Sequence, residues 1–255
     1  MIGTVDGSKI WNSSAAARII AVCATPFVIV AISSANAQVH ADHSPVQVST
    51  IARAPVSINP YVSMFPLEAY LEKSELSEIA LARSAAPASI SGNAEVLVLD
   101  ATGHHRALTG KNGWTCLVQR SWNDAYEKPD FWNPSIRVPI CFNMAAARSI
   151  LPVYLERTKW VLAKRSLADV LVEARAHPVP DPEPGSFAMM MSKQGYLADG
   201  IGPAYPHVMV YMSNVPEAAW GANLLASPVG ATPGYKPSIT VFYLPAKKWS
   251  DGTDP

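Results

Sequence analysis

Residues 94–120 read AEVLVLDATGHHRALTGKNGWTCLVQR and predict three β-strands separated by two tight turns. The run 94–100 is short, apolar and rich in branched side chains, which is typical of a strand buried on both faces. Gly103 favours a first turn, and Asn112-Gly113 favours a second, because Asn-Gly is the strongest short signal for a hairpin. Strands at 94–100, 106–109 and 114–120 are therefore predicted to form a three-stranded meander.

Helical segments flank this β section on both sides in the sequence. The stretch 67–83 is rich in Glu, Leu and Ala and predicts a helix, in one piece or in two. Two more helices are predicted downstream, at 152–164 and at 166–177. Ser166 caps the second, with Asp169 in the capping-box position.

The last third of the chain returns to β structure. Strands are predicted at 187–192, 206–213 and 238–244, with a short helix at 216–225. Because two groups of strands have helices before and between them, the sequence favours an α+β fold. We expect a single domain over 65–255, with a mostly antiparallel sheet and helices packed on one face.

The N-terminus has the three parts of a secretory signal. Lys9 and Arg18 precede an uncharged apolar run from Ile19 to Ile32, and the small residues of Ala35-Asn36-Ala37 follow it. We therefore predict a cleavable signal peptide over 1–37, general secretion, and a secreted or periplasmic product that begins at Gln38. A retained membrane anchor is the alternative, but the run is shorter than the about 20 residues of a membrane-spanning helix.

Charge and composition exclude some partners. The chain has 20 basic and 20 acidic residues and no basic cluster, so no nucleic-acid partner is expected. After the signal, no apolar run is long enough to predict a transmembrane segment. Residues 38–64 are rich in Ser, Val, Ala and Pro and predict an extended, partly disordered leader. No Gly-rich phosphate loop occurs, and we predict no cofactor.

Two cysteines remain after the predicted cleavage, Cys116 and Cys141. In an exported protein the simplest expectation is that they form a disulfide; two buried free thiols are the alternative. The segment 121–143 contains three prolines and predicts a long irregular loop. The disulfide would fasten this loop against the strand at 114–120.

Histidines provide the candidate chemistry. His104 and His105 lie in a predicted turn near Asp100, and His207 begins a predicted strand. Adjacent histidines on a strand point to opposite faces, and no HExxH pattern occurs, so we predict no metal site. A polar turn and a histidine satisfied at a strand end account for these residues equally well.

The segment after the strand at 187–192 has features of a ligand site. Lys193 and Tyr196 are suited to orienting an anion, and the glycine-rich stretch 195–206 is suited to a mobile flap over a pocket. A polar strand end and an ordinary surface loop are the alternative interpretations. The candidate ligand-binding residues are His105, Lys193, Tyr196, Tyr205 and His207.

Several strings carry a resemblance to known sequences. They are EIALARSAAPASIS (78–91), GKNGWTCLVQRSW (110–122), EPG with MMMSKQGYL (183–197), YPHVMVYM (205–212) and KWSDGT (248–253). In their order and spacing the chain resembles a family of uncharacterised exported bacterial proteins of unknown function. The resemblance covers nearly the whole mature chain. It implies that 65–253 is one unit that works outside the cytoplasm, and it implies no activity, ligand or catalytic residue.

Three hypotheses about function follow. The first is a non-catalytic extracytoplasmic domain that binds a small molecule or an envelope partner, because aromatic residues lie on loops and no catalytic motif occurs. The second is a secreted hydrolase that uses His207 with a carboxylate such as Asp199 or Asp100. The third is a structural envelope protein.

Overall fold

The computed structural model describes residues 59–124, 128–177, 179–199, 202–234 and 238–255. These residues belong to one compact unit, Pro55–Pro255. The predicted signal peptide and residues 38–58 of the predicted leader lie outside the described residues. The remaining part of the leader, 59–64, is not free of the domain, because Tyr61 and Met64 pack against an aromatic core cluster.

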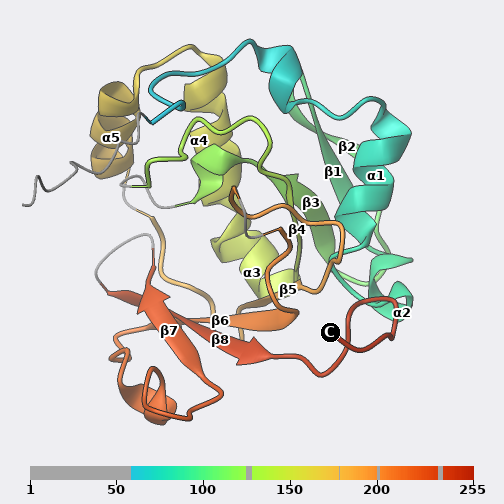
Figure 1. The fold of residues 1–255 in the computed structure, drawn as a ribbon, viewed down its shortest axis with the longest axis vertical. Helices are drawn as coiled ribbons and strands as arrows, with labels where there is room; N and C mark the ends of the chain where they lie inside the picture. The colour runs from blue at the N-terminus through green and yellow to red at the C-terminus, as the bar shows by residue number, and fades with distance from the viewer. Residues whose placement is uncertain (1–58, 125–127, 178, 200–201, 235–237) are drawn as a thin grey trace, which may run out of the picture. The chain divides into compact units, whose positions relative to one another are not determined.

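A single eight-stranded sheet with helices forms the fold (Figure 1). Its strand order is β2-β1-β3-β4-β5-β6-β8-β7, and every pairing except that of β1 with β3 is antiparallel. The strands are β1 (Glu95–Asp100), β2 (Gly103–Leu108), β3 (Thr115–Gln119), β4 (Val138–Phe142), β5 (Phe187–Met190), β6 (His207–Ser213), β7 (Gly230–Pro233) and β8 (Ile239–Pro245). The helices are η1 (Leu67–Tyr70), α1 (Glu75–Arg83), α2 (Ala88–Ser91), η2 (Ser121–Asn123), α3 (Met144–Ser149), α4 (Leu151–Leu162), α5 (Leu167–Ala176) and η3 (Ala219–Gly221). The predicted α+β class with a mostly antiparallel sheet is confirmed.

The predicted meander over 94–120 is wrong in its topology. β1 and β2 form the expected hairpin, but β3 lies on the other side of β1 and runs parallel to it. The Asn112 side chain bonds to the Ile90 carbonyl and the Trp114 amide, so the Asn-Gly turn carries the chain past the end of β1. Gly110 permits this crossing, because a Cβ there would lie 2.3 Å from the Glu95 nitrogen.

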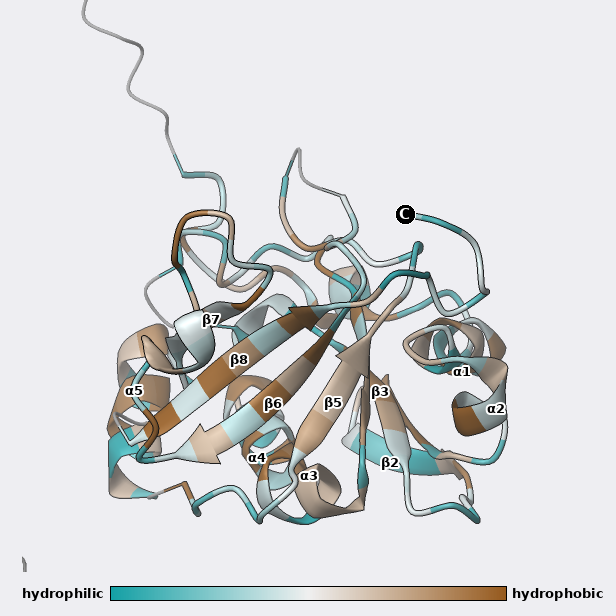
Figure 2. Ribbon diagram, turned by 90° about the horizontal axis from the view of Figure 1, so that it is seen from below, coloured by the Kyte–Doolittle hydropathy of each residue, from teal (hydrophilic) through white to brown (hydrophobic). Residues whose placement is uncertain are grey.

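Helices cover both faces of the sheet rather than one, which corrects that part of the prediction. Strand side chains alternate between faces, so each buried strand provides one row to each layer. The first core contains Leu97, Leu117, Ile140 and Phe142 of the sheet. They pack with Ala146 of α3, with Ile150 between α3 and α4, and with Tyr154 of α4. The second contains Val96, Val98, Cys116, Val118 and Cys141 of the sheet. They pack with Ala82 of α1 and with Ala85 and Ala86, which follow α1. Figure 2 shows α1 and α2 apart from α3, α4 and α5.

The predicted loop 121–143 contains a central strand, so that prediction is wrong over 138–142. All five residues of β4 are buried, and Cys141 lies opposite Cys116 of β3. Pro139 obscured the strand in the sequence, because proline in a run argues against a central strand. The predicted disulfide Cys116–Cys141 is confirmed, with an S–S distance of 2.00 Å.

Most other predicted elements are confirmed, but the strand predicted at 106–109 begins at Gly103, so His104 and His105 lie on a strand and not in a turn. The first helix occurs in two pieces, η1 and α1, and α5 begins at the predicted Ser166–Asp169 capping box. The predicted helix at 216–225 is wrong: only the single turn η3 forms there. The edge strand β7 and the short helices α2 and α3 were not predicted.

Candidate functional site

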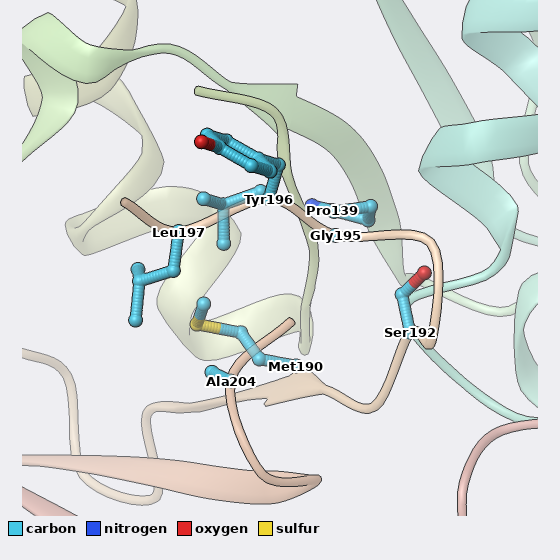
Figure 3. A pocket seen from close by; sticks show the side chains of 8 residues that line it. Pro139, Met190, Ser192, Gly195, Tyr196, Leu197 and Ala204 are labelled. Atoms are coloured by element: carbon cyan, nitrogen blue, oxygen red, sulfur yellow. The ribbon is translucent and has the colours of Figure 1, made fainter. Parts of the chain in front are cut away.

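A hollow lies beneath the start of the segment 195–206 (Figure 3). Its walls come from β4, the end of β5 and the segment that follows. The lining residues are Val138, Pro139, Met190, Ser192, Gly195, Tyr196, Leu197 and Ala204. The cavity volume is about 10 Å³, which is room for about one water molecule. Pockets for small molecules are typically about 300–1,000 Å³, so this hollow does not take a ligand of that size.

The described parts of the predicted flap are fastened to the domain. Tyr196 and Arg137 exchange two backbone hydrogen bonds, with N···O distances of 3.0 and 2.7 Å. The Leu197 amide also donates to the Gly202 carbonyl at 2.8 Å. Residues 200 and 201 of the predicted flap lie outside the described residues. The first part of the segment is thus an extension of the sheet rather than a free lid.

Asp199 fastens three segments together. Its carboxylate accepts hydrogen bonds from the hydroxyls of Tyr61 and Tyr196, at 2.6 and 2.9 Å, and from the Asn133 amide at 3.0 Å. These bonds favour the ionised form and lower the pKa of Asp199. The same bond to Asp199 raises the pKa of Tyr61 to about 12. Asp199 therefore ties the chain at 59–64 to the domain, and is not poised beside a histidine.

His207 lies on β6 with its ring against Tyr243, at a centroid distance of 5.5 Å. Its Nδ1 lies 2.6 Å from the Tyr205 carbonyl, so Nδ1 carries the proton and donates it. Nε2 is buried and finds no hydrogen-bond partner among the residues that the structure describes, and burial lowers the pKa of the ring. Within the described residues His207 forms no ion pair with a carboxylate. A buried Nε2 does not reach a substrate proton, as a general base must.

His104 and His105 lie far from His207. They are on β2, and four strands separate β2 from β6, which amounts to roughly 24 Å of sheet at about 4.8 Å per strand. His105 contacts Asp100 at 3.0 Å and Glu75 at 3.6 Å. In the part of the chain that the structure describes, no three metal-ligating side chains form a cluster.

Both ring nitrogens of His104 are buried, and among the described residues neither has a hydrogen-bond partner. Burial, with the positive charge of Arg120 as a second cause, lowers its pKa to about 3. The ring is therefore neutral at physiological pH. It shares the interior beneath α4 with apolar neighbours, since its strand partner Leu99 belongs to the aromatic core cluster.

Lys193 and Tyr205 do not join the hollow either. Lys193 forms an exposed ion pair with Asp251, at 3.0 Å. Tyr205 is 60% exposed and contributes its carbonyl to His207. Of the five candidate ligand-binding residues, the structure places Tyr196 at the hollow and brings only Tyr205 and His207 together. Whether any of them binds a ligand stays a prediction.

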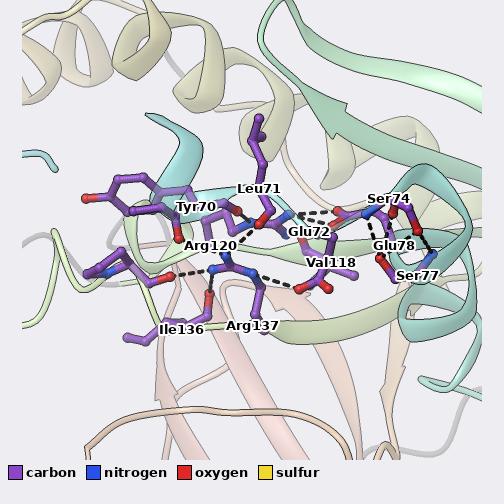
Figure 4. A network of polar contacts seen from close by, with 12 residues as sticks. Tyr70, Leu71, Glu72, Ser74, Ser77, Glu78, Val118, Arg120, Ile136 and Arg137 are labelled. Carbon is purple, nitrogen blue, oxygen red and sulfur yellow. Dashed lines mark hydrogen bonds and ion pairs between the residues drawn. The ribbon is translucent and has the colours of Figure 1, made fainter. Parts of the chain in front are cut away.

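A buried polar network was not predicted from the sequence (Figure 4). The Arg120 side chain is 0% exposed and donates two hydrogen bonds to Glu78, at 2.9 and 2.7 Å. It also donates to the carbonyls of Tyr70 and Val118, each at 2.7 Å. Arg137, close by, bonds to Glu72. Because these partners are carboxylates and carbonyls of the domain itself, the network positions α1 and the segment before it on the sheet.

A second feature missed by the sequence analysis is an exposed apolar segment between β6 and β7, residues 214–229, called here the apolar loop. Trp220 is 51% exposed, Leu224 64% and Leu225 fully exposed. The inner edge of the loop packs on the sheet, where Trp220 lies 4.3 Å from Phe242 between ring centroids. The sequence could have indicated this segment, because no charged residue occurs from 218 to 234.

Within the described residues, no helix is both long and apolar enough to cross a bilayer. Comparison with known proteins gives no identity: no protein family, no curated protein and no solved structure matches this chain. The resemblance to exported bacterial proteins therefore stays a prediction.

Proposed function

We propose that this protein is an exported, non-catalytic domain that binds a component of the cell envelope through its surface. The observation that carries the proposal is the apolar loop, with Trp220, Leu224 and Leu225 exposed together. Single exposed apolar side chains are ordinary, but a group of them on one segment marks a site of protein or membrane interaction.

Two further observations favour binding at the surface over the alternatives. The hollow at Tyr196 is too small for a small molecule of ordinary size. His207 has a buried Nε2 and a carbonyl partner rather than a carboxylate, which gives the hydrolase hypothesis no support.

The disulfide and the predicted N-terminal signal both support an exported location. Cys116 and Cys141 are both 0% exposed and joined across neighbouring strands. Structural disulfides persist in oxidising compartments such as the bacterial periplasm and the cell exterior. Together with the predicted signal peptide over 1–37, this supports export.

Fractionation tests the proposal. The full chain is produced in a bacterial host, and the exported product is followed in the envelope membranes and in the soluble extract. We expect the wild type and Leu76→Asp to associate with the envelope and Leu225→Asp to appear in the soluble extract. Leu76, on α1, is a matched control because it is 78% exposed but has the charged Glu75 and the polar Ser77 as its neighbours in the sequence. A wild-type product found only in the soluble extract, or three proteins that fractionate alike, would contradict the proposal.

A further inference from the structure

The tip of the apolar loop is a tight turn with apolar corners. The Ser227 amide donates to the Leu224 carbonyl at 3.0 Å, so Leu225 and Ala226 occupy the two corner positions. Ala226 has a φ of 63°, a conformation for which glycine or asparagine is the usual residue at the third position of a turn. The geometry of the turn does not require a leucine at position 225 either, and the side chain of Leu225 is fully exposed.

The base of the loop holds this tip away from the sheet. The Asn223 side chain exchanges two hydrogen bonds with the backbone of Ala231, at 2.9 and 3.0 Å. The backbone N–H of Asn223 donates to the Val229 carbonyl. Trp220 has a left-handed backbone, φ 59°, which is strained for a bulky residue. The contact of its ring with Phe242, at an interplanar angle of 32°, holds Trp220 in this conformation. Hydrogen bonds and packing at the base of the loop therefore keep Leu224 and Leu225 in solvent, so that they do not fold back onto the sheet.

The charge pattern of the loop and of the adjoining strand fits a hydrocarbon environment. From 218 to 234 the chain contains no Asp, Glu, Lys or Arg, so insertion of this stretch removes no ionised side chain from water. Tryptophan is favoured at the boundary between headgroups and acyl chains, and leucine deeper. Trp220 at the base and Leu225 at the tip follow that order.

A second copy of this chain fits the surface less well than a bilayer does. The edge strand β7 is only four residues long and ends at Pro233, which has no N–H for pairing with another strand. The three exposed side chains present on the order of 400 Å² of apolar surface, about half of what one partner contributes to a standard protein interface. Insertion into a bilayer needs no matching shape, and its strength scales with the apolar area that is buried.

We infer that the envelope component is the lipid bilayer itself, into whose interfacial layer the apolar loop inserts Leu224, Leu225 and the edge of Trp220. This inference rests on the proposed function and names its partner.

A dye attached to the tip of the loop tests this directly. Leu225→Cys and Leu76→Cys are made in the full chain with Cys23→Ser, and each is labelled with an environment-sensitive dye. Cys116 and Cys141 are buried in their disulfide, so the label goes to the introduced thiol. The dye reports the surroundings of its own position, whether or not residues 1–37 have been cleaved. Vesicles of phosphatidylcholine are the membrane probe.

We expect the emission of the dye at 225 to shift to shorter wavelength with added vesicles and to be quenched by acyl-chain quenchers. The dye at 76 should keep its aqueous emission. Added phosphatidylglycerol or salt should change the response little, because residues 218–229, which form the exposed part of the loop, carry no charge to screen. An unshifted dye at 225, or equal shifts at both positions, would overturn the inference.

Two other outcomes also overturn it. A shift at 225 that depends on protein concentration and needs no lipid points to a second copy as the occupant. A dye at 225 that ignores vesicles, in a product that still fractionates with envelope membranes, points to a protein or glycan partner; the proposed function then stands and only the lipid is wrong.

Discussion

Arg120 shows how a single residue can place a charge in the interior of this protein. Moving a guanidinium and a carboxylate out of water costs several kcal/mol for each ion. Here the cost is offset by the two-bond contact with Glu78 and by the carbonyls of Tyr70 and Val118. The pair joins α1 to the end of β3, so it fixes the position of the helix on the sheet.

Removing one member of this pair should be severe. We expect Glu78→Gln to lower the free energy of unfolding by about 3–5 kcal/mol, because it leaves a buried guanidinium without its counter-charge. The exposed pair of Glu156 and Lys159 is the control, and Glu156→Gln should change the same quantity by less than about 0.5 kcal/mol. Urea unfolding followed by circular dichroism measures both. Equal effects for the two variants would contradict the argument.

His104 should make the stability depend on pH. Its pKa is lowered to about 3 in the folded protein, whereas an unfolded histidine titrates near about 6.5. As the pH falls, the histidine of the unfolded state therefore takes up a proton before that of the folded state. The contribution of His104 to the free energy of unfolding is thus fully present above pH 6.5 and is lost as the pH falls toward 3. Below pH 6 this contribution to the free energy of unfolding should fall by up to about 1.4 kcal/mol per pH unit.

His104→Leu isolates this contribution. Urea unfolding of the wild type and the variant at pH 7.5, 6 and 5 should show a shallower loss for the variant, because carboxylates shared by both proteins cancel in the comparison. Parallel curves would show that His104 is not the group responsible.

At the scale of elements, the disulfide joins two neighbouring interior strands of the sheet, β3 and β4. β3 and β4 are buried along their whole length, and the bridge crosses between residues that face each other in register. It closes a loop with a sequence separation of 25 residues. That loop carries η2 and the aromatic residues Trp122, Phe131 and Trp132, all of them buried. The bridge thus holds an otherwise irregular segment against the core.

Removing the bridge should destabilise the domain without changing its fold. We expect Cys116→Ala with Cys141→Ala to lower the free energy of unfolding by about 3 kcal/mol, because the unfolded chain regains the entropy of an open loop. Thermal unfolding of the double variant, compared with the oxidised wild type, measures this. An unchanged midpoint would show that packing alone holds β4 in the sheet.

At the scale of the whole molecule, the disulfide and the predicted N-terminal signal lead to one expectation about the finished protein. The intact mass of the exported product should match a chain that begins at Gln38, with no alkylation unless reductant is added first. Retention of residues 1–37 would contradict cleavage, and alkylation without reductant would contradict the bridge. Mass spectrometry of the purified product gives both results in one experiment.

Local signals in the sequence determined local structure well. The Ser166–Asp169 capping box, the apolar run of β1 and the alternation along β6 are patterns of neighbouring residues, and each element forms where its pattern lies. The pairing of Cys116 with Cys141 was predictable for a different reason, because only two cysteines follow the predicted signal peptide, and an exported protein with two cysteines is expected to pair them. The α+β class follows from the order of these elements along the chain.

Tertiary structure alone decided what depends on distant partners. Asn112-Gly113 makes a crossing turn rather than a hairpin because its asparagine bonds to Ile90. β4 forms despite Pro139 because both of its neighbours are in the sheet. The sequence determined which residues are apolar, but not that Leu225 stays exposed while Arg120 is buried. Burial is settled by the contacts that segments far apart in the chain make, and such contacts leave no periodic signal in the sequence.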